Sequence, residues 1–228
     1  MTIKSCFWLM AGVFVFSNNV AHAEIEEDGR LWLNVNAKGK LPVEGLNWYA
    51  EIQPRWREEG KNFDQLLIRP AIFYKLSGKS SIWLGYANVN SHPAGRSTTT
   101  EDRLWQQFTY QFDPIADVSI TSRTRFEQRW LDNTNDTGYR LRQMIKLARP
   151  IASVPNLSWV ASDEYYINAN DTDWGARSGF DQNRLFLGGA YKINPTAKIE
   201  MGYLNQYVNG AKVDRMNHVL STTVEMSF

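Results

Sequence analysis

Apolar and polar side chains alternate with a period of two along most of this chain, in segments of 10 to 14 residues. This period belongs to a β-strand, because successive side chains of an extended backbone point to opposite faces. The segment 46–57 separates into two rows: Leu46, Trp48, Ala50, Ile52 and Trp56 against Asn47, Glu51, Gln53, Arg55 and Arg57. A mean hydropathy of −0.43 argues against a bundle of membrane helices. We therefore expect an all-β protein.

The length of these segments separates a membrane barrel from a soluble sandwich. Soluble strands usually have about 5 to 6 residues, whereas a tilted strand that crosses a bilayer needs about 9 to 11. Aromatic residues also gather near the expected strand ends, as in interfacial girdles: Trp48, Trp83, Tyr110, Phe112, Trp130, Tyr139, Trp159, Tyr191 and Tyr207. The sequence thus predicts a closed antiparallel up-and-down transmembrane β-barrel.

The expected connections alternate between long and short ones, as external loops and periplasmic turns do in outer-membrane barrels. The segments 90–102, 169–179 and 208–217 are long, and 113–117 and 194–195 are short. This order supports the barrel independently of strand length.

The strand count does not fit a simple barrel. We expect strands at 31–40, 46–57, 63–76, 81–89, 103–112, 118–130, 138–149, 157–168, 180–191, 196–207 and 216–228. These are eleven, whereas bacterial single-chain barrels have an even number. Either 31–40 lies outside a ten-strand wall, or 24–45 contains a twelfth strand. Pro54 and Pro70 lack the N–H that a ladder needs, so we expect bulges there.

The first 23 residues have the order of a secretory signal peptide. Lys4 is the only charge, 7–16 is apolar, and Ala21 and Ala23 stand where a signal peptidase reads. Ten apolar residues are too few for a spanning helix, which needs roughly 20. We expect cleavage to leave 24–228 as a single barrel domain without a cysteine, in the outer membrane of a Gram-negative cell.

The last strand alternates to the carboxyl end through Leu220, Val224, Met226 and Phe228. This pattern resembles the terminal strand of bacterial outer-membrane proteins, in which a final aromatic residue contributes to recognition by the barrel-assembly machinery. The partners that we expect are therefore this machinery, outer-membrane lipids and lipopolysaccharide, and we expect a monomer.

Several segments resemble the bacterial family called domain of unknown function 2490. The resemblance covers nearly the whole mature chain and depends on 83–87, 101–107, 123–129, 163–164 and 183–186. It implies a small outer-membrane barrel. Because no activity is established for such proteins, the resemblance assigns no catalytic residue.

The charged rows face the interior if lipid covers the apolar rows. The predicted network comprises Arg55, Arg57, Arg69, Arg103, Arg123, Arg125, Glu127, Arg129, Arg140, Arg142, Lys146, Glu164, Arg184 and Glu200. With a hairpin turn near 134–135, Glu127 would lie opposite Arg142, and Arg129 opposite Arg140. The interior would carry a net positive charge.

Two hypotheses explain this interior. An Arg and Glu network fills it, or the excess of arginine makes a narrow anion-preferring pore. Barrels of about 8 strands are filled by side chains, and open channels have about 16 to 18 strands. For 10 to 12 strands we favour a largely filled interior, with a biochemical role that the sequence leaves open.

Other functional classes have little support. The 25 basic and 24 acidic residues are spread along the chain, which argues against a nucleic-acid partner. An outer-leaflet lipid-modifying enzyme needs a nucleophile beside a histidine, but the nearest same-face hydroxyl to His218 is that of Thr222, about 13 Å away. The segment 132–138 departs from a calcium loop. We expect no enzymatic activity, no metal and no cofactor.

Overall fold

The computed structural model describes residues 25–228 and contains no helix among them. None of the described residues belongs to a helix long and apolar enough to cross a membrane. The predicted signal peptide at 1–23 lies outside the described residues. The strands are β1 (Ile25–Lys40), β2 (Leu46–Arg57), β3 (Asn62–Lys75), β4 (Ser80–Ser91), β5 (Thr99–Gln111), β6 (Ser119–Leu131), β7 (Thr137–Pro150), β8 (Leu157–Asn168), β9 (Gly179–Asn194), β10 (Ala197–Val208) and β11 (Asp214–Ser227).

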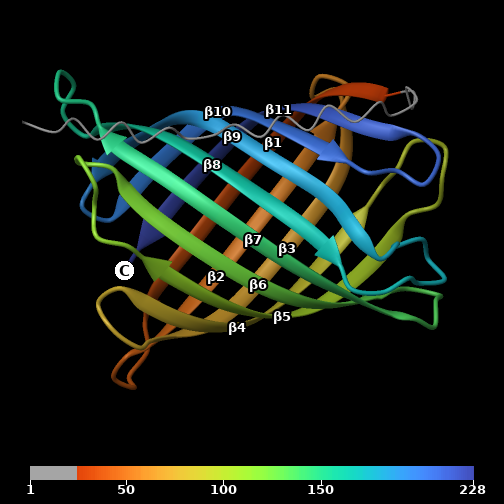
Figure 1. The fold of residues 1–228 in the computed structure, drawn as a ribbon, viewed down its shortest axis with the longest axis horizontal. Helices are drawn as coiled ribbons and strands as arrows, with labels where there is room; N and C mark the ends of the chain where they lie inside the picture. Colours follow the sequence, from red (N-terminus) through yellow and green to blue (C-terminus); the bar gives the residue numbers. More distant parts are fainter. Residues whose placement is uncertain (1–24) are drawn as a thin grey trace, which may run out of the picture.

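All eleven strands form one closed barrel (Figure 1). This confirms the predicted closed all-β barrel of 10 to 12 strands. Sequence neighbours pair antiparallel, but β1 and β11 pair in parallel from Ile25↔Asp214 to Lys38↔Ser227. The prediction of a purely antiparallel barrel was wrong, as were both expectations about 24–45. The segment 31–40 belongs to the wall, and its strand begins at Ile25 without a further strand. An odd number of alternating strands makes the first and last run the same way, so only a parallel pair can close the barrel.

The odd count also places the two described ends at opposite ends of the barrel (Figure 1). Ile25 lies at the end that carries the connections 58–61, 92–98, 132–136, 169–178 and 209–213, which we call the loop end. Phe228 lies at the other end, the turn end, with 41–45, 76–79, 112–118, 151–156 and 195–196. The longest connection, 169–178, and the shortest, 195–196, follow the prediction. Two others do not: 112–118 was expected to be short and is as long as 92–98, and 208–217 was expected to be long but shortens to the connection 209–213.

The two prolines occupy places where the ladder is interrupted. The pairing of β2 with β1 skips Pro54, and the pairing of β3 with β4 skips Pro70. Each proline therefore lies where its missing N–H costs no ladder hydrogen bond. A register shift lies beside Pro54, between Arg55 and Trp56. No shift accompanies Pro70, so the bulge expected there was wrong.

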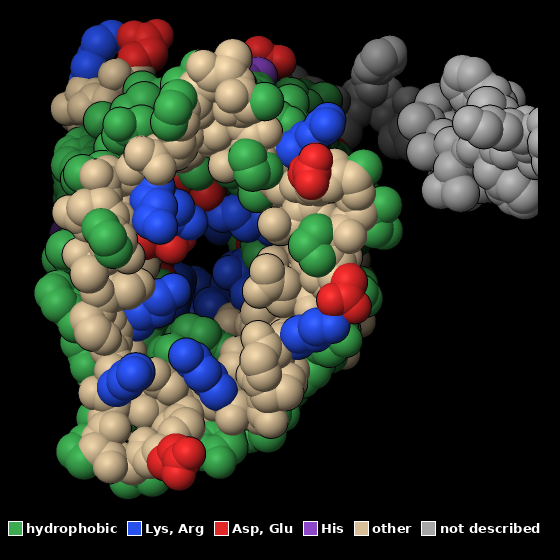
Figure 2. Space-filling view, turned by 90° about the vertical axis from the view of Figure 1, so that its left-hand side faces the viewer, with side chains coloured by type: hydrophobic (Ala, Val, Ile, Leu, Met, Phe, Trp, Pro, Cys, Tyr) green, Lys and Arg blue, Asp and Glu red, His purple; other side chains and the backbone are tan. Residues whose placement is uncertain are grey.

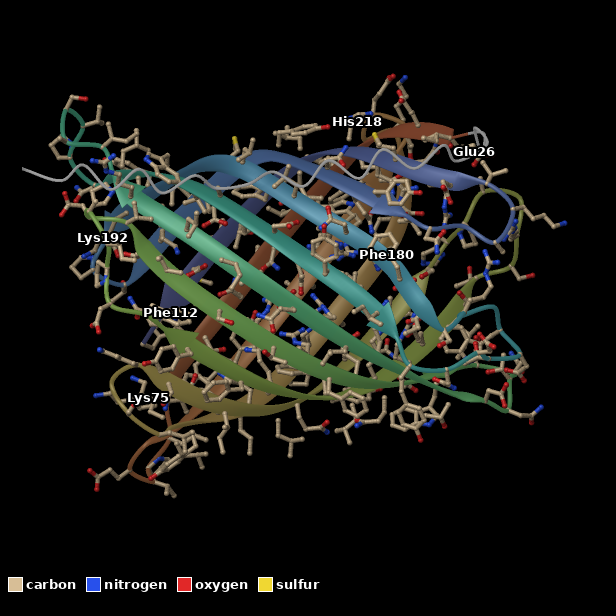
Figure 3. All side chains as sticks on the ribbon, in the orientation of Figure 1. Glu26, Lys75, Phe112, Phe180, Lys192 and His218 are labelled. Carbon is tan, nitrogen blue, oxygen red and sulfur yellow. The ribbon has the colours of Figure 1, made fainter. Side chains whose placement is uncertain are left out.

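The two faces of the wall differ in polarity. Large apolar side chains cover the outside, among them Ile68, Ile72, Leu84, Leu185 and Leu187. Figure 2 shows the turn end, where a hollow is lined mainly by Lys and Arg with some Asp and Glu, and hydrophobic side chains lie around the outside. The sticks in Figure 3 show side chains extending outward from the wall as well as into the interior. The barrel is thus apolar on its outer face and charged on its inner face.

Candidate functional site

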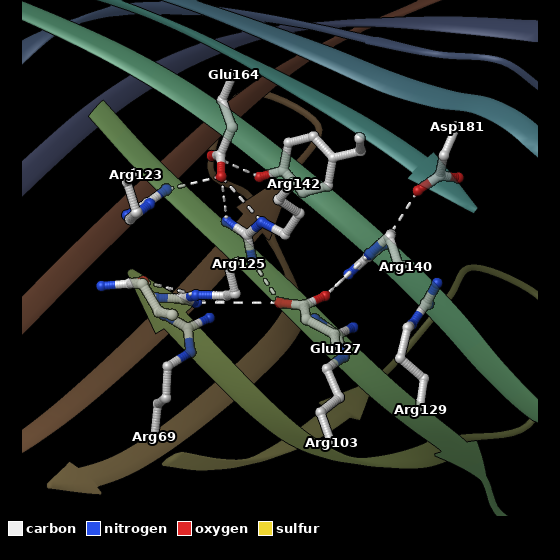
Figure 4. Close-up of polar contacts among 12 residues, drawn as sticks. Arg69, Arg103, Arg123, Arg125, Glu127, Arg129, Arg140, Arg142, Glu164 and Asp181 are labelled. Carbon is white, nitrogen blue, oxygen red and sulfur yellow. Dashed lines mark hydrogen bonds and ion pairs between the residues drawn. The ribbon is translucent and has the colours of Figure 1, made fainter. Parts of the chain in front are cut away.

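Glu127 of β6 is at the centre of an ion-pair network inside the barrel. Its side chain is buried, with 1% exposed. Its Oε2 accepts hydrogen bonds from Arg140 Nε at 2.9 Å and Nη2 at 2.6 Å. Its Oε1 accepts one from Arg142 Nη1 at 2.7 Å (Figure 4). Both arginines lie on β7, the strand next to β6, so one hairpin supplies the centre of the network.

The network continues across β8 and β9. Arg142 also contacts Glu164 at 2.9 Å, and the same carboxylate accepts a hydrogen bond from Arg123 at 2.7 Å. Arg140 reaches Asp181 at 3.0 Å. Each of the two β7 arginines therefore bridges two carboxylates. This arrangement suits the guanidinium group, whose several N–H groups can satisfy more than one acceptor.

The register of this hairpin differs from the prediction. Glu127 lies opposite Arg140, and Arg129 lies opposite Gly138. The predicted pairs were wrong by two residues, because the ladder is centred between 133 and 134 and not between 134 and 135. Glu127 still reaches Arg142 as a diagonal neighbour, since side chains two residues apart share a face.

Three further carboxylates form ion pairs nearby. Glu101 binds both Arg103 at 2.8 Å and Arg129 at 2.6 Å. Glu51 accepts two hydrogen bonds from Arg69 Nη1, at 2.6 and 2.7 Å. Towards the turn end, Lys146 donates to Glu200 at 2.6 Å. The interior therefore contains paired charges along most of its height.

The remaining predicted interior residues are placed differently. Arg57 lies at the rim and contacts Glu58 at 3.4 Å. Arg125 donates to Gln107 at 2.6 and 2.9 Å and lies 4.1 Å from the Trp105 ring centroid. In the described part of the chain, the side-chain hydrogen bonds of Arg55 end on Gln53 and Gln65, and that of Arg184 ends on Gln182.

The predicted terminal strand pairs with both of its neighbours. Val224 lies opposite Val35 of β1, and Leu220 faces outward. Met226 lies opposite Ala197 of β10. Phe228 is 74% exposed and its ring stacks on Trp48 at 6.3 Å. The final aromatic residue is therefore accessible at the turn end.

Two cavities occupy the interior. One, of about 330 Å³, lies towards the loop end and is lined by nine arginines and three carboxylates. The other, of about 360 Å³, lies towards the turn end and is lined by eight basic and four acidic side chains. Only Arg55, Arg69, Arg142 and Arg184 line both cavities. The cavities therefore meet at a group of four arginines, which we call the arginine neck.

A family model for a protein of unknown function (DUF2490) matches residues 29–217. The chain belongs to the DUF2490 family. It is also 36% identical, over 206 residues, to an uncharacterised protein of Methylorubrum extorquens, and the alignment covers 88% of each chain. The family membership confirms the resemblance found in the sequence.

Two aromatic residues inside the DUF2490 barrel were not predicted as site residues. Trp32 is 2% exposed, and the Arg55 Cζ lies 3.9 Å from its ring centroid. The Tyr166 ring centroid lies 4.5 Å from the Arg142 Cζ and 4.8 Å from the Arg184 Cζ. In their strands, both stand at alternate positions with polar residues that face the interior. This alternation could have predicted that they face the interior as well. Trp83 was expected in a girdle, but its row faces inward and it lines the turn-end cavity.

His218 lies on the outer face of this DUF2490 barrel near the loop end. Its Nδ1 is 2.6 Å from the Tyr203 hydroxyl, and its Nε2 is 3.7 Å from a Glu27 carboxylate oxygen. Tyr203 could not be found from the pattern of the last strand alone, because this hydroxyl comes from the neighbouring strand β10. The described residues include no group of three His, Cys, Asp or Glu side chains that could hold a metal ion.

Proposed function

We propose that this protein is an integral outer-membrane β-barrel of a Gram-negative cell, exported by the signal at 1–23. The outer face supports this, because exposed apolar side chains occur on nearly all of the strands. Monomeric soluble proteins rarely expose contiguous apolar patches of more than a few hundred Å². Trp130, Trp159 and Tyr191 lie exposed near strand ends, as interfacial aromatics do.

We further propose that the interior is a narrow anion-preferring pore. The observation that carries this proposal is the arginine neck, since the same four side chains line cavities on both sides of it. Rings of arginine favour anions by their charge, and no carboxylate joins the four residues that the cavities share.

Planar-bilayer recording of the purified protein tests the pore. Under a KCl gradient, we expect a small conductance whose reversal potential has the sign of a chloride preference. Arg142→Ala removes one charge of the neck and should reduce this preference. Arg149→Ala removes an exposed charge of β7 and is the matched control. Absence of ion-selective current would refute the pore. The hypothesis that the Arg and Glu network fills the interior would then remain.

The proposed partners are outer-membrane lipids, lipopolysaccharide and the barrel-assembly machinery, which would recognise the terminal strand ending at Phe228. We propose no enzymatic role, because the hydroxyl beside His218 is a phenol, whereas acyl transfer commonly uses Ser, Thr or Cys. Incubation with phospholipid and lipopolysaccharide, followed by mass spectrometry, should leave all acyl chains unchanged. A released or transferred acyl chain that disappears in His218→Ala would establish the enzyme instead.

A further inference from the structure

The four arginines of the neck differ in how their charge is balanced. Arg69 has Glu51 at 2.6 Å, and Arg142 has Glu127 at 2.7 Å. Arg55 and Arg184 have only amide partners among the described residues. Arg55 donates to Gln53 and Gln65 at 2.8 Å each, and Arg184 donates through Nε to Gln182 at 3.2 Å. The neck therefore contains two guanidinium groups that form no ion pair within 4.0 Å with a carboxylate of residues 25–228.

These two guanidinium groups lie against the same aromatic ring. The Cζ atoms of Arg55 and Arg184 are 3.9 Å and 4.9 Å from the Trp32 ring centroid, which limits their separation to at most 8.8 Å. Arg184 also lies 4.8 Å from the Tyr166 ring centroid. The aromatic faces attract the cations and fix their positions. The rings do not remove the repulsion between two like charges.

Hydrogen-bond donors at this place lack acceptors. Arg55 is 7% exposed, and its Nε has no hydrogen-bond partner among the described residues. The buried Trp32 Nε1 has none either. Arg184 is half-buried, and its two terminal nitrogens have no acceptor among residues 25–228. A buried charge without a counterion is unfavourable, so this group of donors is suited to an anion from outside the protein.

We propose that Arg55, Arg184 and Trp32 form a binding site for the oxyanion group of a small solute that carries a phosphate or a carboxylate. A guanidinium group presents paired N–H donors that match two oxygens of such a group. The inference deepens the proposed pore, because it gives the solute class for its narrowest part. It rests on that proposal only for the access of solute from both sides.

Binding can be measured separately from current. We expect isothermal titration of the detergent-folded protein with inorganic phosphate or acetate, at low salt, to show saturable binding at one site. Chloride should bind at least tenfold more weakly, since it cannot accept several directed hydrogen bonds through separate oxygens. Tighter binding of phosphate or of acetate identifies which of the two groups the site prefers.

Substitution locates the binding. Arg184→Gln should weaken oxyanion binding at least tenfold, whereas Arg215→Gln, which removes a charge from the same cavity away from Trp32, should change it less than twofold. A heat-modifiability gel verifies the fold of each variant. If Arg184→Gln does not fold, Arg184→Lys replaces it, because Lys keeps the charge, loses the paired donors and should also weaken binding.

The outcomes separate the two proposals. Oxyanion binding that depends on Arg184 without any current supports the site and refutes the pore. An anion-selective current without saturable oxyanion binding, or with equal effects of Arg184→Gln and Arg215→Gln, refutes the site and leaves the pore. The site is also refuted if chloride binds as tightly as phosphate and acetate.

Discussion

Substitution of Glu127 tests whether the ion-pair network stabilises the barrel. Glu127→Gln keeps the shape of the side chain but removes its charge. Three hydrogen bonds to guanidinium groups end on this carboxylate, and hydrogen bonds to charged groups contribute about 1.5–3 kcal/mol each. Their sum is an upper limit, because Arg140 keeps Asp181, Arg142 keeps Glu164, and the amide oxygen still accepts. We expect the free energy of unfolding to fall by about 2–4 kcal/mol, close to the effect of breaking a buried ion pair.

The measurement is urea unfolding of the protein in lipid vesicles, followed by tryptophan fluorescence, with the dependence on urea concentration compared between variants. Glu59→Gln is the matched control, because Glu59 is exposed and pairs with the exposed Lys61. Surface pairs contribute about 0–1 kcal/mol, so the control should change stability by no more than that. A Glu127→Gln protein as stable as the wild type would show that the network is not a stabilising element.

Three further predictions concern the wall and its orientation. Gly202→Ala should prevent folding or strongly destabilise the barrel, because the new Cβ would meet the Leu187 carbonyl and lie 2.5 Å from the Gly188 Cα, whereas Gly78→Ala has nothing within 4 Å; a heat-modifiability gel distinguishes the two. A tag in 169–178 should be labelled on intact cells and a tag in 112–118 only after permeabilisation, and the reverse result would invert the proposed orientation. The wild-type protein should require detergent for extraction, and release by salt or alkali would refute membrane insertion.

Much of the fold could be predicted from local pattern, because alternation within one strand needs only the residues of that strand. The segment 46–57 is the clearest case, since its polar row is the one buried inside the barrel. The beginning of β1 is different. Its residues 25–30 are mostly polar and show no alternation, and they form a strand because β11 lies beside them. The parallel closure depends on where two distant segments meet, and no local pattern carries that information.

The interior pairs could be predicted only in part. The two-residue alternation within each strand placed Glu127 and the arginines of β6 and β7 on the same face. Which of them form pairs depends on the register of the hairpin. The position of the turn within 132–136 differs from the predicted one and shifts the register by two residues. The sequence of this segment is compatible with several turn positions. A shift of two leaves every side chain on its predicted face and changes only its partner. The site residues were thus more predictable than their contacts.

The neck could not have been predicted from any single strand. Trp32 and Arg55 are cross-strand neighbours on β1 and β2, whereas Arg184 comes from β9, which is separated from β1 by β10 and β11. Arg184 contacts Trp32 because the closed wall brings β9 and β1 close enough for their inward side chains to touch across the interior. A barrel of eleven strands is intermediate in strand number between barrels that side chains fill and barrels that leave an open channel. At this size, long arginine side chains reach the middle of the interior from several strands, while cavities remain above and below them. The strand number sets the width of the barrel, and this width lets the four arginines approach one another at mid-height. Arg55 and Arg184, which form no ion pair with a carboxylate of the described residues, are the two that a solute anion would bind.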